Sequence, residues 1–336
     1  MIGRSRRALV NAAVAIVVAA GVIVAAAGLW FRAAVYGDRS HPAAAATFIV
    51  PRGATLGQVA AGLAGAGILA HPLAFRILAR LRDEEAGVQS GQFRFPAHQT
   101  SDEILRRLVT GAADALWVTF PEGFTVRQIG ARLASRSLAD PVAFDRYAAR
   151  TRLQVDGTWT RSLEGFLFPS TYLVPVGAAP GRIARILTDQ FFRELPANAA
   201  SKARALGLDV PQVITIASLI EREAQADDER SLMAGVYYNR LRAGMPLEVD
   251  ATIEYVFPEH HTVITRRDLE IDSPYNTYRH TGLPPTPIAN PGKASIDAAF
   301  APVHSQYLYY VYKGNGHHAF AKTLEEHNAN VERYLH

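Results

Sequence analysis

One carboxyl group in this sequence is a strong candidate for acid–base chemistry. Residues 209–225, DVPQVITIASLIEREAQ, predict a helix in which Asp209 caps the start and Pro211 lies in the first turn. The first half is apolar on nearly every side, which predicts burial, and charged residues begin abruptly at Glu221. A carboxyl held at the edge of an apolar surface suits a general acid near neutral pH. The alternative is a helix that emerges into water there with a solvated charged face.

Aromatic residues in the same half of the chain favour a carbohydrate ligand. Nine of the 13 tyrosines lie between Tyr237 and Tyr312. A tyrosine offers a flat apolar face with a polar tip, which suits stacking on a sugar ring. Tyr275 and Tyr278 lie in a loop rich in Pro and Gly, with Asn276 between them, whereas the run YLYYVY predicts a half-buried strand.

The composition excludes several other kinds of site. Without cysteine the chain has no disulfide, thiolate nucleophile or Cys-ligated metal. The pairs His260-His261 and His317-His318 lack H-E-x-x-H spacing, and adjacent histidines on a strand point to opposite faces, so no metal or other cofactor is expected. Five arginines against one aspartate within residues 1–40 account for the whole net charge of +4. The rest of the chain therefore has no excess positive charge for nucleic acid.

The N-terminal region predicts a membrane anchor. Ala8 to Phe31 is an apolar run of 24 residues, which as a helix would be about 36 Å long and would cross a hydrocarbon core of about 30 Å. Trp30 lies at its outer end, and three arginines precede it, which favours a cytoplasmic N-terminus. A cleaved signal peptide is the alternative, since Ala25 and Ala27 resemble a cleavage site, but its apolar region is usually about 7–15 residues.

A short pattern occurs three times in the chain. Pro, Thr, Val or Ile, and Leu follow one another at intervals of four residues. Pro ends a predicted strand, Thr caps a predicted helix, and the two later residues share one helical face. Each unit is too small to bury its own apolar face, so we expect the copies to pack together; chance recurrence of common residues is the alternative. The copies are Pro51-Thr55-Val59-Leu63, Pro96-Thr100-Ile104-Leu108 and Pro121-Thr125-Ile129-Leu133.

Five segments taken in order give the chain a resemblance to a known family. They resemble the MltG/YceG-like family, the membrane-anchored endolytic murein transglycosylases, in sequence, order and spacing. Ser170 and Ala251 depart from the family pattern, where Asp and Pro are usual. The segments are LEGFLFPSTYLVP (163–175), IASLIEREA (216–224), NRLRAGMPLEVDATIEY (239–255), DSPYNTYRHTGLPPTPIANPG (272–292) and HHAFAKTLEEHN (317–328).

The resemblance implies a mechanism that uses one carboxyl and no cofactor. Glu221 would protonate the glycosidic oxygen between N-acetylmuramic acid and N-acetylglucosamine. As a carboxylate it would then accept the proton of the muramoyl 6-hydroxyl, which attacks its own anomeric carbon and leaves a 1,6-anhydro end. Such an enzyme is a lyase. Glu223, the nearest competitor, lies about 200° around the helix.

Further site residues, partners and location are also expected from the resemblance. The partners would be peptidoglycan strands, the membrane and penicillin-binding proteins, with the catalytic domain on the outer side of the inner membrane. The alternative function is a non-catalytic, membrane-anchored scaffold that binds glycan; a metal-dependent wall amidase or peptidase lacks the ligand spacing. The expected substrate-binding residues are Glu164, Asp250, Thr252, Tyr275, Asn276 and Tyr278.

Together these patterns predict an α+β protein of five segments. The repeat units resemble LysM-like modules, small βααβ folds of cell-wall proteins. The expected order is a cytoplasmic tail, a transmembrane helix, a linker that acts as a short tether, a small LysM-like α+β module and a larger mixed α+β catalytic domain. Their expected bounds are 1–7, 8–31, 32–45, 46–117 and 118–336.

Overall fold

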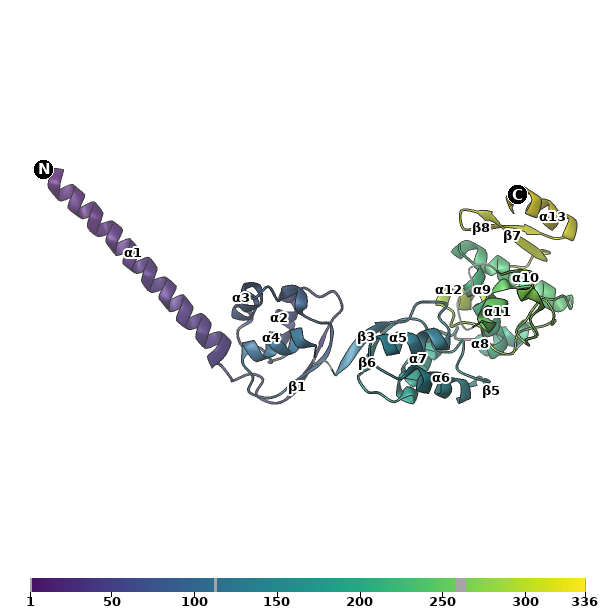
Figure 1. Ribbon diagram of the computed structural model, residues 1–336, viewed down its shortest axis with the longest axis horizontal. Helices are drawn as coiled ribbons and strands as arrows, with labels where there is room; N and C mark the ends of the chain where they lie inside the picture. The colour runs from purple at the N-terminus through teal and green to yellow at the C-terminus, as the bar shows by residue number, and fades with distance from the viewer. Residues whose placement is uncertain (1, 112–113, 258–263, 336) are drawn as a thin grey trace. The chain divides into compact units, whose positions relative to one another are not determined.

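The chain has a mixed α+β fold that follows one long N-terminal helix. The computed structural model describes residues 2–111, 114–257 and 264–335, with side chains from Val14 onward (Figure 1). The long helix is α1 (Ile2–Arg32), and both helices and strands follow it. The predicted α+β class is therefore confirmed.

Contacts divide the chain into two compact units. The first comprises Met1–Trp117 and Leu173–Val176, and the second comprises Val118–Tyr172 and Gly177–His336. The first unit contains the stretch Val14–Gly37, which by length and composition is able to span a membrane. The predicted apolar helix is present.

The first unit contains a sheet built from the strands of the repeat. Strand β1 pairs antiparallel with β2, and β2 pairs antiparallel with β3. The strand order is β1-β2-β3-β6, so the strands that open the three copies are neighbours. The helix of the third copy, Val126–Ser135, belongs to the second unit, so the expected packing of all three copies together holds for the strands but not for that helix. Its elements are β1 (Ala46–Val50), α2 (Leu56–Gly65), α3 (Pro72–Leu81), β2 (Gly91–Phe95), α4 (Ser101–Thr110), β3 (Ala115–Thr119) and the end of β6 (Thr171–Pro175).

Each copy of the repeat has the predicted capped helix. Thr55, Thr100 and Thr125 are the N-cap residues of α2, α4 and α5 (Val126–Ser135). In all three, the threonine side chain accepts a hydrogen bond from the backbone N–H three residues later, and the Gln or Glu there bonds back to the threonine's own N–H. These reciprocal bonds satisfy two backbone donors that the first helical turn leaves free.

The predicted linker 32–45 is only partly a tether. Ala33–Gly37 forms a turn of π-helix, and Ala34 and Val35 are buried in the core of the first unit. Ser101 at the start of α4 donates a hydrogen bond to the carbonyl oxygen of Ala34 at 3.2 Å. The apolar pair binds the core because two small apolar side chains gain more from burial than from exposure.

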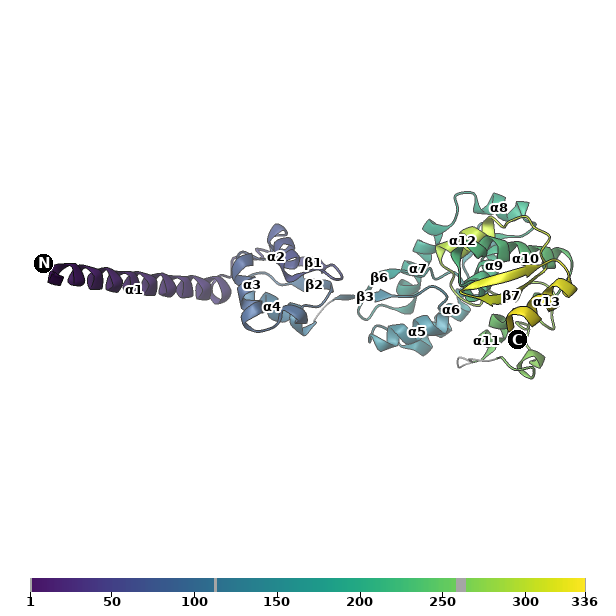
Figure 2. The same ribbon diagram turned by 90° about the horizontal axis from the view of Figure 1, so that it is seen from above.

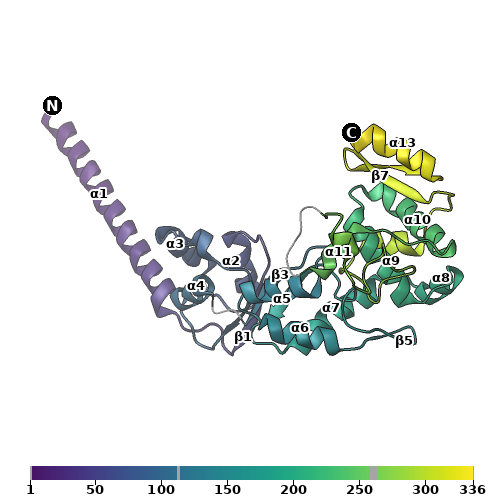
Figure 3. The same ribbon diagram turned by 45° about the vertical axis from the view of Figure 1, so that its right-hand side comes forward.

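The second unit is mainly helical, with two short hairpins. Strand β4 pairs with β5, and β7 pairs with β8, both antiparallel. Helix α13 packs against the β7–β8 hairpin, as Figure 3 shows. The elements after α5 are α6 (Pro141–Arg150), β4 (Gln154–Val155), β5 (Thr158–Trp159), β6, α7 (Pro180–Glu194), α8 (Ala199–Ala205), α9 (Val210–Glu223), α10 (Arg230–Arg242), α11 (Asp250–Val256), α12 (Lys293–Phe300), β7 (Tyr309–Gly314), β8 (His317–Ala321) and α13 (Leu324–Leu335), with 3-10 turns at Asp227–Glu229 and Asp268–Glu270; the first unit has a 3-10 turn at Glu85–Gly87.

Helix α9 is the centre of the second unit's core. Asp209 is its N-cap and forms a reciprocal pair of bonds with Gln212. The predicted burial through Ile220 is confirmed, except for two residues of the first turn: Pro211 is half-buried and Gln212 is exposed. Helices α10, α11 and α12 pack against α9, and Figure 2 shows α10 and α12 beside it. The end of α9 therefore has a fixed position.

Thr55→Ala should weaken helix α2 through its cap. Loss of an N-cap hydroxyl costs about 1 kcal/mol, so amide exchange in the first turns of α2 should become about fivefold faster. Hydrogen–deuterium exchange of the full chain, read on peptides from α2, measures this. Thr55→Ser keeps the hydroxyl and is the matched control. Equal protection in the alanine and serine variants would show that the cap does not stabilise α2.

Candidate active site

Glu221 lies in the last turn of α9 with its carboxylate held from two sides. Its side chain is 8% exposed. Oε2 accepts a hydrogen bond from the backbone N–H of Gly292 at 3.0 Å, and Nη1 of Arg230 lies 3.6 Å from the same oxygen. Two further contacts hold the Arg230 side chain. Its Nε donates to a carboxylate oxygen of Asp227 at 3.0 Å, and its Nη1 donates to the hydroxyl oxygen of Ser295 at 2.5 Å. The carboxylate is therefore oriented by a backbone donor and a guanidinium that cannot move freely.

A second carboxyl that the sequence analysis missed lies beside Glu221. A Cβ atom added to Gly292 would be 2.0 Å from Oε1 of Glu122, so this carboxyl occupies the space over the glycine. Partial desolvation, and then the negative charge of Glu221, raise the pKa of Glu122. The repeat could have indicated Glu122, because the residue after Pro is acidic only in the third copy. The first two copies have Arg52 and Ala97 at this position.

Asn290 ties together the loops around these carboxyls. Its side chain donates to the carbonyl oxygen of Phe124 at 2.8 Å and accepts from the N–H of Leu167 at 2.8 Å. Its own carbonyl accepts a hydrogen bond from the N–H of Gly123 at 3.0 Å. The segment that carries Glu122 is thereby fixed to the loop that ends at Gly292. Asn290 was not identified from the sequence, because its role depends on contacts more than 100 residues away.

Glu223 has surroundings of its own. Its carboxylate accepts bonds from the N–H of Ala251 at 3.4 Å and the hydroxyl of Tyr310 at 3.3 Å. Burial, followed by the charge of Asp250, raises the pKa of Glu223 to about 7. Tyr278 donates to Asp250 at 2.6 Å, so two residues predicted from the sequence meet near this carboxyl. Glu223 is therefore a physically credible competitor of Glu221, although it contacts α11 and β7 instead.

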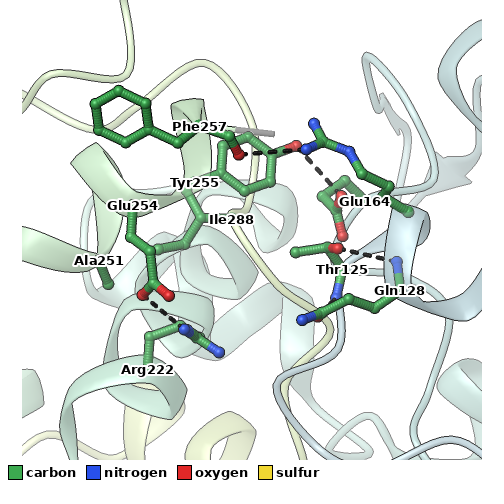
Figure 4. Close-up of a pocket in the computed structure, with 10 residues that line it drawn as sticks. Thr125, Gln128, Glu164, Arg222, Ala251, Glu254, Tyr255, Phe257 and Ile288 are labelled. Carbon is green, nitrogen blue, oxygen red and sulfur yellow. Dashed lines mark hydrogen bonds and ion pairs between the residues drawn. The ribbon is translucent and has the colours of Figure 1, made fainter. Parts of the chain in front are cut away.

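A pocket of about 460 Å³ opens beside these groups (Figure 4). Its lining includes Glu164, Arg222, Glu254 and Tyr255, and Arg222 bonds Glu254 at 2.8 Å. Glu221 lies outside the lining, one residue before Arg222. Both of their side chains reach Gly123, since a Cβ there would be 3.7 Å from Cγ of Glu221 and 3.8 Å from Cδ of Arg222.

Glu164 is a buried carboxyl in the wall of this pocket. It accepts hydrogen bonds from the N–H of Val126 at 3.0 Å, the amide of Asn290 at 3.1 Å and the hydroxyl of Tyr255 at 3.2 Å. Burial raises the pKa of Glu164 to about 8 despite these donors. Figure 4 shows it facing Tyr255 across the pocket wall. The carboxyl anchors the start of α5 as well as lining the pocket.

Two of the predicted substrate-binding residues are inside the protein. Thr252 is fully buried and donates to the carbonyl oxygen of Val249 at 2.7 Å. Asn276 is fully buried too, and its amide nitrogen donates to the carbonyl oxygens of Leu269 and Ile271, both at 2.9 Å. Their polar atoms have partners within the loops, so both residues hold the loops in place, and their direct contact with substrate stays a prediction.

The two tyrosines of the same loop are both half-buried but have different partners. The hydroxyl of Tyr275 lies 2.8 Å from that of Thr286, and its ring packs at 5.0 Å from the ring of Tyr255. The backbone N–H of Tyr278 donates to the side-chain oxygen of Asn276 at 3.0 Å. Asn276 therefore positions Tyr278, while Tyr275 supports the Tyr255 wall of the pocket.

The β7–β8 hairpin holds the residue that directly precedes Arg230. The backbone N–H of His318 donates to the carboxylate of Glu229, and the ring Nδ1 of His318 lies 2.9 Å from the same carboxylate. The side chains of His318 and Glu229 are both buried. Glu229 immediately precedes Arg230. No cluster of three His, Asp or Glu side chains able to hold a metal occurs among the described residues, and His260-His261 lie outside them.

Glu164→Gln should remove a pH dependence of stability. With an ordinary pKa of 4.5 and a folded pKa of about 8, the folded chain keeps a proton that the unfolded chain has lost between these values. Stability from this group is therefore complete below the lower value and falls as pH rises through the window, by at most about 1.4 kcal/mol per pH unit.

Thermal unfolding across this pH window measures the effect as a difference in slope between the parent and the variant. Slopes are compared because a buried amide also changes the hydrogen bonds at any single pH. Glu332→Gln, on the surface of α13, is the control. Identical slopes in parent and Glu164→Gln would show that the carboxyl is ionised in the fold.

Comparisons with known proteins agree with this architecture. The model of the YceG-like family matches residues 48–333. An endolytic murein transglycosylase of Bacillus subtilis is 32% identical over 310 residues, which are 85% of this chain and 84% of that protein. One of Streptococcus pneumoniae is 26% identical over 322 residues, which are 85% of this chain and 58% of that protein.

A solved structure gives the same result at the level of the fold. The 2.6 Å crystal structure of a YceG-like protein from Listeria monocytogenes matches with a TM-score of 0.57 and 27% identity. The match covers 85% of this chain and 98% of that chain. The family model alone spans well over half of the sequence, and the Bacillus relative is matched along most of its length. The chain therefore belongs to the YceG-like family.

Proposed function

We propose that this protein is an endolytic lytic transglycosylase that cleaves peptidoglycan strands. The observation that carries the proposal is the carboxyl of Glu221 directly after the buried stretch Val213–Ile220 of α9, held by the Gly292 N–H and faced by Arg230. Two relatives that bear the name endolytic murein transglycosylase support the reaction class.

In the proposed reaction Glu221 is first an acid and then a base. Its proton passes to the glycosidic oxygen between the muramoyl and glucosaminyl sugars as the bond from that oxygen to the muramoyl anomeric carbon breaks. The 6-hydroxyl of the same muramoyl sugar then bonds to the anomeric carbon and gives its proton to the carboxylate. No water is consumed, and the product carries a 1,6-anhydro end. Gly292 and Arg230 stabilise the carboxylate between the two transfers.

The role of Glu122 is what separates the proposed lytic reaction from ordinary hydrolysis. Ordinary glycosidases place a second carboxylate where it activates water or attacks the sugar. In our proposal Glu122 orients Glu221 and the sugar but activates no water, since the intramolecular 6-hydroxyl already occupies the attacking position. The chemical form of the product therefore separates the two mechanisms.

The pocket and the Asp250–Tyr278 pair are the proposed sugar-binding surfaces. Glu164, Tyr255 and Arg222 offer hydrogen-bonding groups around an aromatic wall, which suits a sugar with an acetamido group. Asp250 and Tyr278 present a carboxylate and a phenol on the other side of α9's end. We assign Thr252, Tyr275 and Asn276 to the positioning of these groups.

The first unit fits a membrane-anchored glycan-binding module. The order β1-α2-α3-β2, with antiparallel β1 and β2, matches the βααβ order of a LysM-like module. We propose that α1 crosses the inner membrane with its N-terminus in the cytoplasm, and that penicillin-binding proteins are partners. The alternative, a non-catalytic scaffold, has no use for an oriented carboxyl at the end of a buried helix.

Glu221→Gln should remove nearly all cleavage. General acid–base assistance is worth about 10²–10⁴ in rate, and a group that serves both steps should lie at the upper end. Glu223→Gln should cost much less, because that carboxyl contacts α11 and β7 instead of the Gly292 loop. Mass spectrometry of digested cell wall measures the anhydro-muropeptides formed by each variant.

Binding and folding controls complete this experiment. Glycan binding should survive in Glu221→Gln, since the amide removes the transferable proton but keeps the shape, and thermal unfolding checks the fold. Near-parent activity in Glu221→Gln with a dead Glu223→Gln would identify Glu223 as the acid. Full activity in both would leave the scaffold function. Hydrolytic instead of anhydro ends would reject the intramolecular attack.

The full-length protein should remain in the membrane after an alkaline wash. An apolar stretch of this length partitions into a bilayer almost irreversibly. Protease added from the outer side alone should digest the C-terminal unit. A soluble, N-terminally trimmed protein as the main species would instead indicate a cleaved signal peptide.

A further inference from the structure

Helix α3 has two apolar faces, of which only one packs against the core. Ala74, Phe75 and Leu78 are buried. On the opposite side Leu73 is 59% exposed and Leu81 is 73% exposed. Large apolar side chains that share an exposed helical face mark a surface that contacts something other than water.

Two arginines lie beside the exposed apolar face of α3. Leu73, Ile77 and Leu81 are spaced four residues apart and form one stripe, and Arg76 and Arg80 lie next to it. All five line a shallow groove of about 170 Å³. The side chain of Arg80 is 77% exposed. An apolar stripe flanked by arginines is the pattern of a helix that lies in the headgroup region of a bilayer.

Both ends of α3 are fixed to the residues that follow α1. His71, the N-cap residue, contacts the carboxylate of Asp38 at 2.9 Å. Arg82, the C-cap residue, donates to the hydroxyl of Tyr36 at 3.3 Å. Tyr36 belongs to the apolar stretch Val14–Gly37, and Asp38 follows it directly. Figures 1 and 2 both show α3 beside the C-terminal end of α1.

We propose that α3 lies in the outer surface of the phospholipid bilayer, with its exposed stripe among the acyl chains and Arg76 and Arg80 at the phosphates. The bilayer is the favoured occupant because both ends of α3 are bonded to Tyr36 and Asp38, which follow the end of the proposed transmembrane helix α1 at Arg32 by only four and six residues. The inference rests on the anchor proposed above. It gives the first unit a second, peripheral attachment that fixes its tilt relative to the membrane.

Single cysteine reporters test this directly, because the chain has no cysteine of its own. Full-length Leu73→Cys and Leu81→Cys would carry an environment-sensitive fluorophore in vesicles of phosphatidylcholine and phosphatidylglycerol. Lipids with a nitroxide near the headgroup should quench both reporters several-fold more than a reporter at Thr47→Cys, an exposed position on β1. All three positions are exposed, so labelling should not disturb the fold.

A reporter at Ile23→Cys in α1 separates failure of the anchor from failure of the inference. Quenching at Ile23 by nitroxides deep in the bilayer, without quenching at Leu73 and Leu81, would overturn the role of α3 alone. No quenching at Ile23 would overturn the anchor and the role of α3 together. Emission at Leu73 and Leu81 that responds to protein density but not to nitroxide lipids would assign the stripe to another copy of the chain.

Discussion

Helix α9 has apolar side chains around most of its circumference, and the geometry of the site depends on its burial. The side chain of Ser218, fully buried within it, accepts a hydrogen bond from the N–H of Ile288 at 3.0 Å and donates to the carbonyl of Thr215 at 2.7 Å. A satisfied buried hydroxyl fixes the register between helix and loop. The loop then brings the N–H of Gly292 to Glu221. Movement of the helix would therefore disturb the core and the carboxyl together.

Local sequence was sufficient for the elements whose structure is decided locally. The three threonine caps were predictable because each cap and its partner are three residues apart. The burial of α9 through Ile220 followed from its continuous apolar surface. In these cases short-range chemistry and the fold agree.

The remaining features depend on residues far apart in sequence. Glu122 becomes part of the site because a loop 170 residues later places a glycine under its carboxyl. Asn276 and Thr252 looked like solvent-facing polar residues, yet burial directs their polar atoms inward. Val35 looked like linker but completes the core of the first unit. A single sequence gives no distances between such segments, so neither the second carboxyl nor the buried amides could be identified.

The hairpin of β7 and β8 has a consequence for the order in which the protein is made. Tyr310 contacts Glu223 from 87 residues further along the chain, and His318 contacts Glu229 from 89 residues further along. Because synthesis runs from the N-terminus, it reaches α9 well before these strands. The carboxyls of Glu223 and Glu229 therefore gain their final neighbours only after the hairpin has emerged. Until the hairpin has folded, a partly made chain therefore carries Glu223 and Glu229 without the partners that surround them in the complete fold.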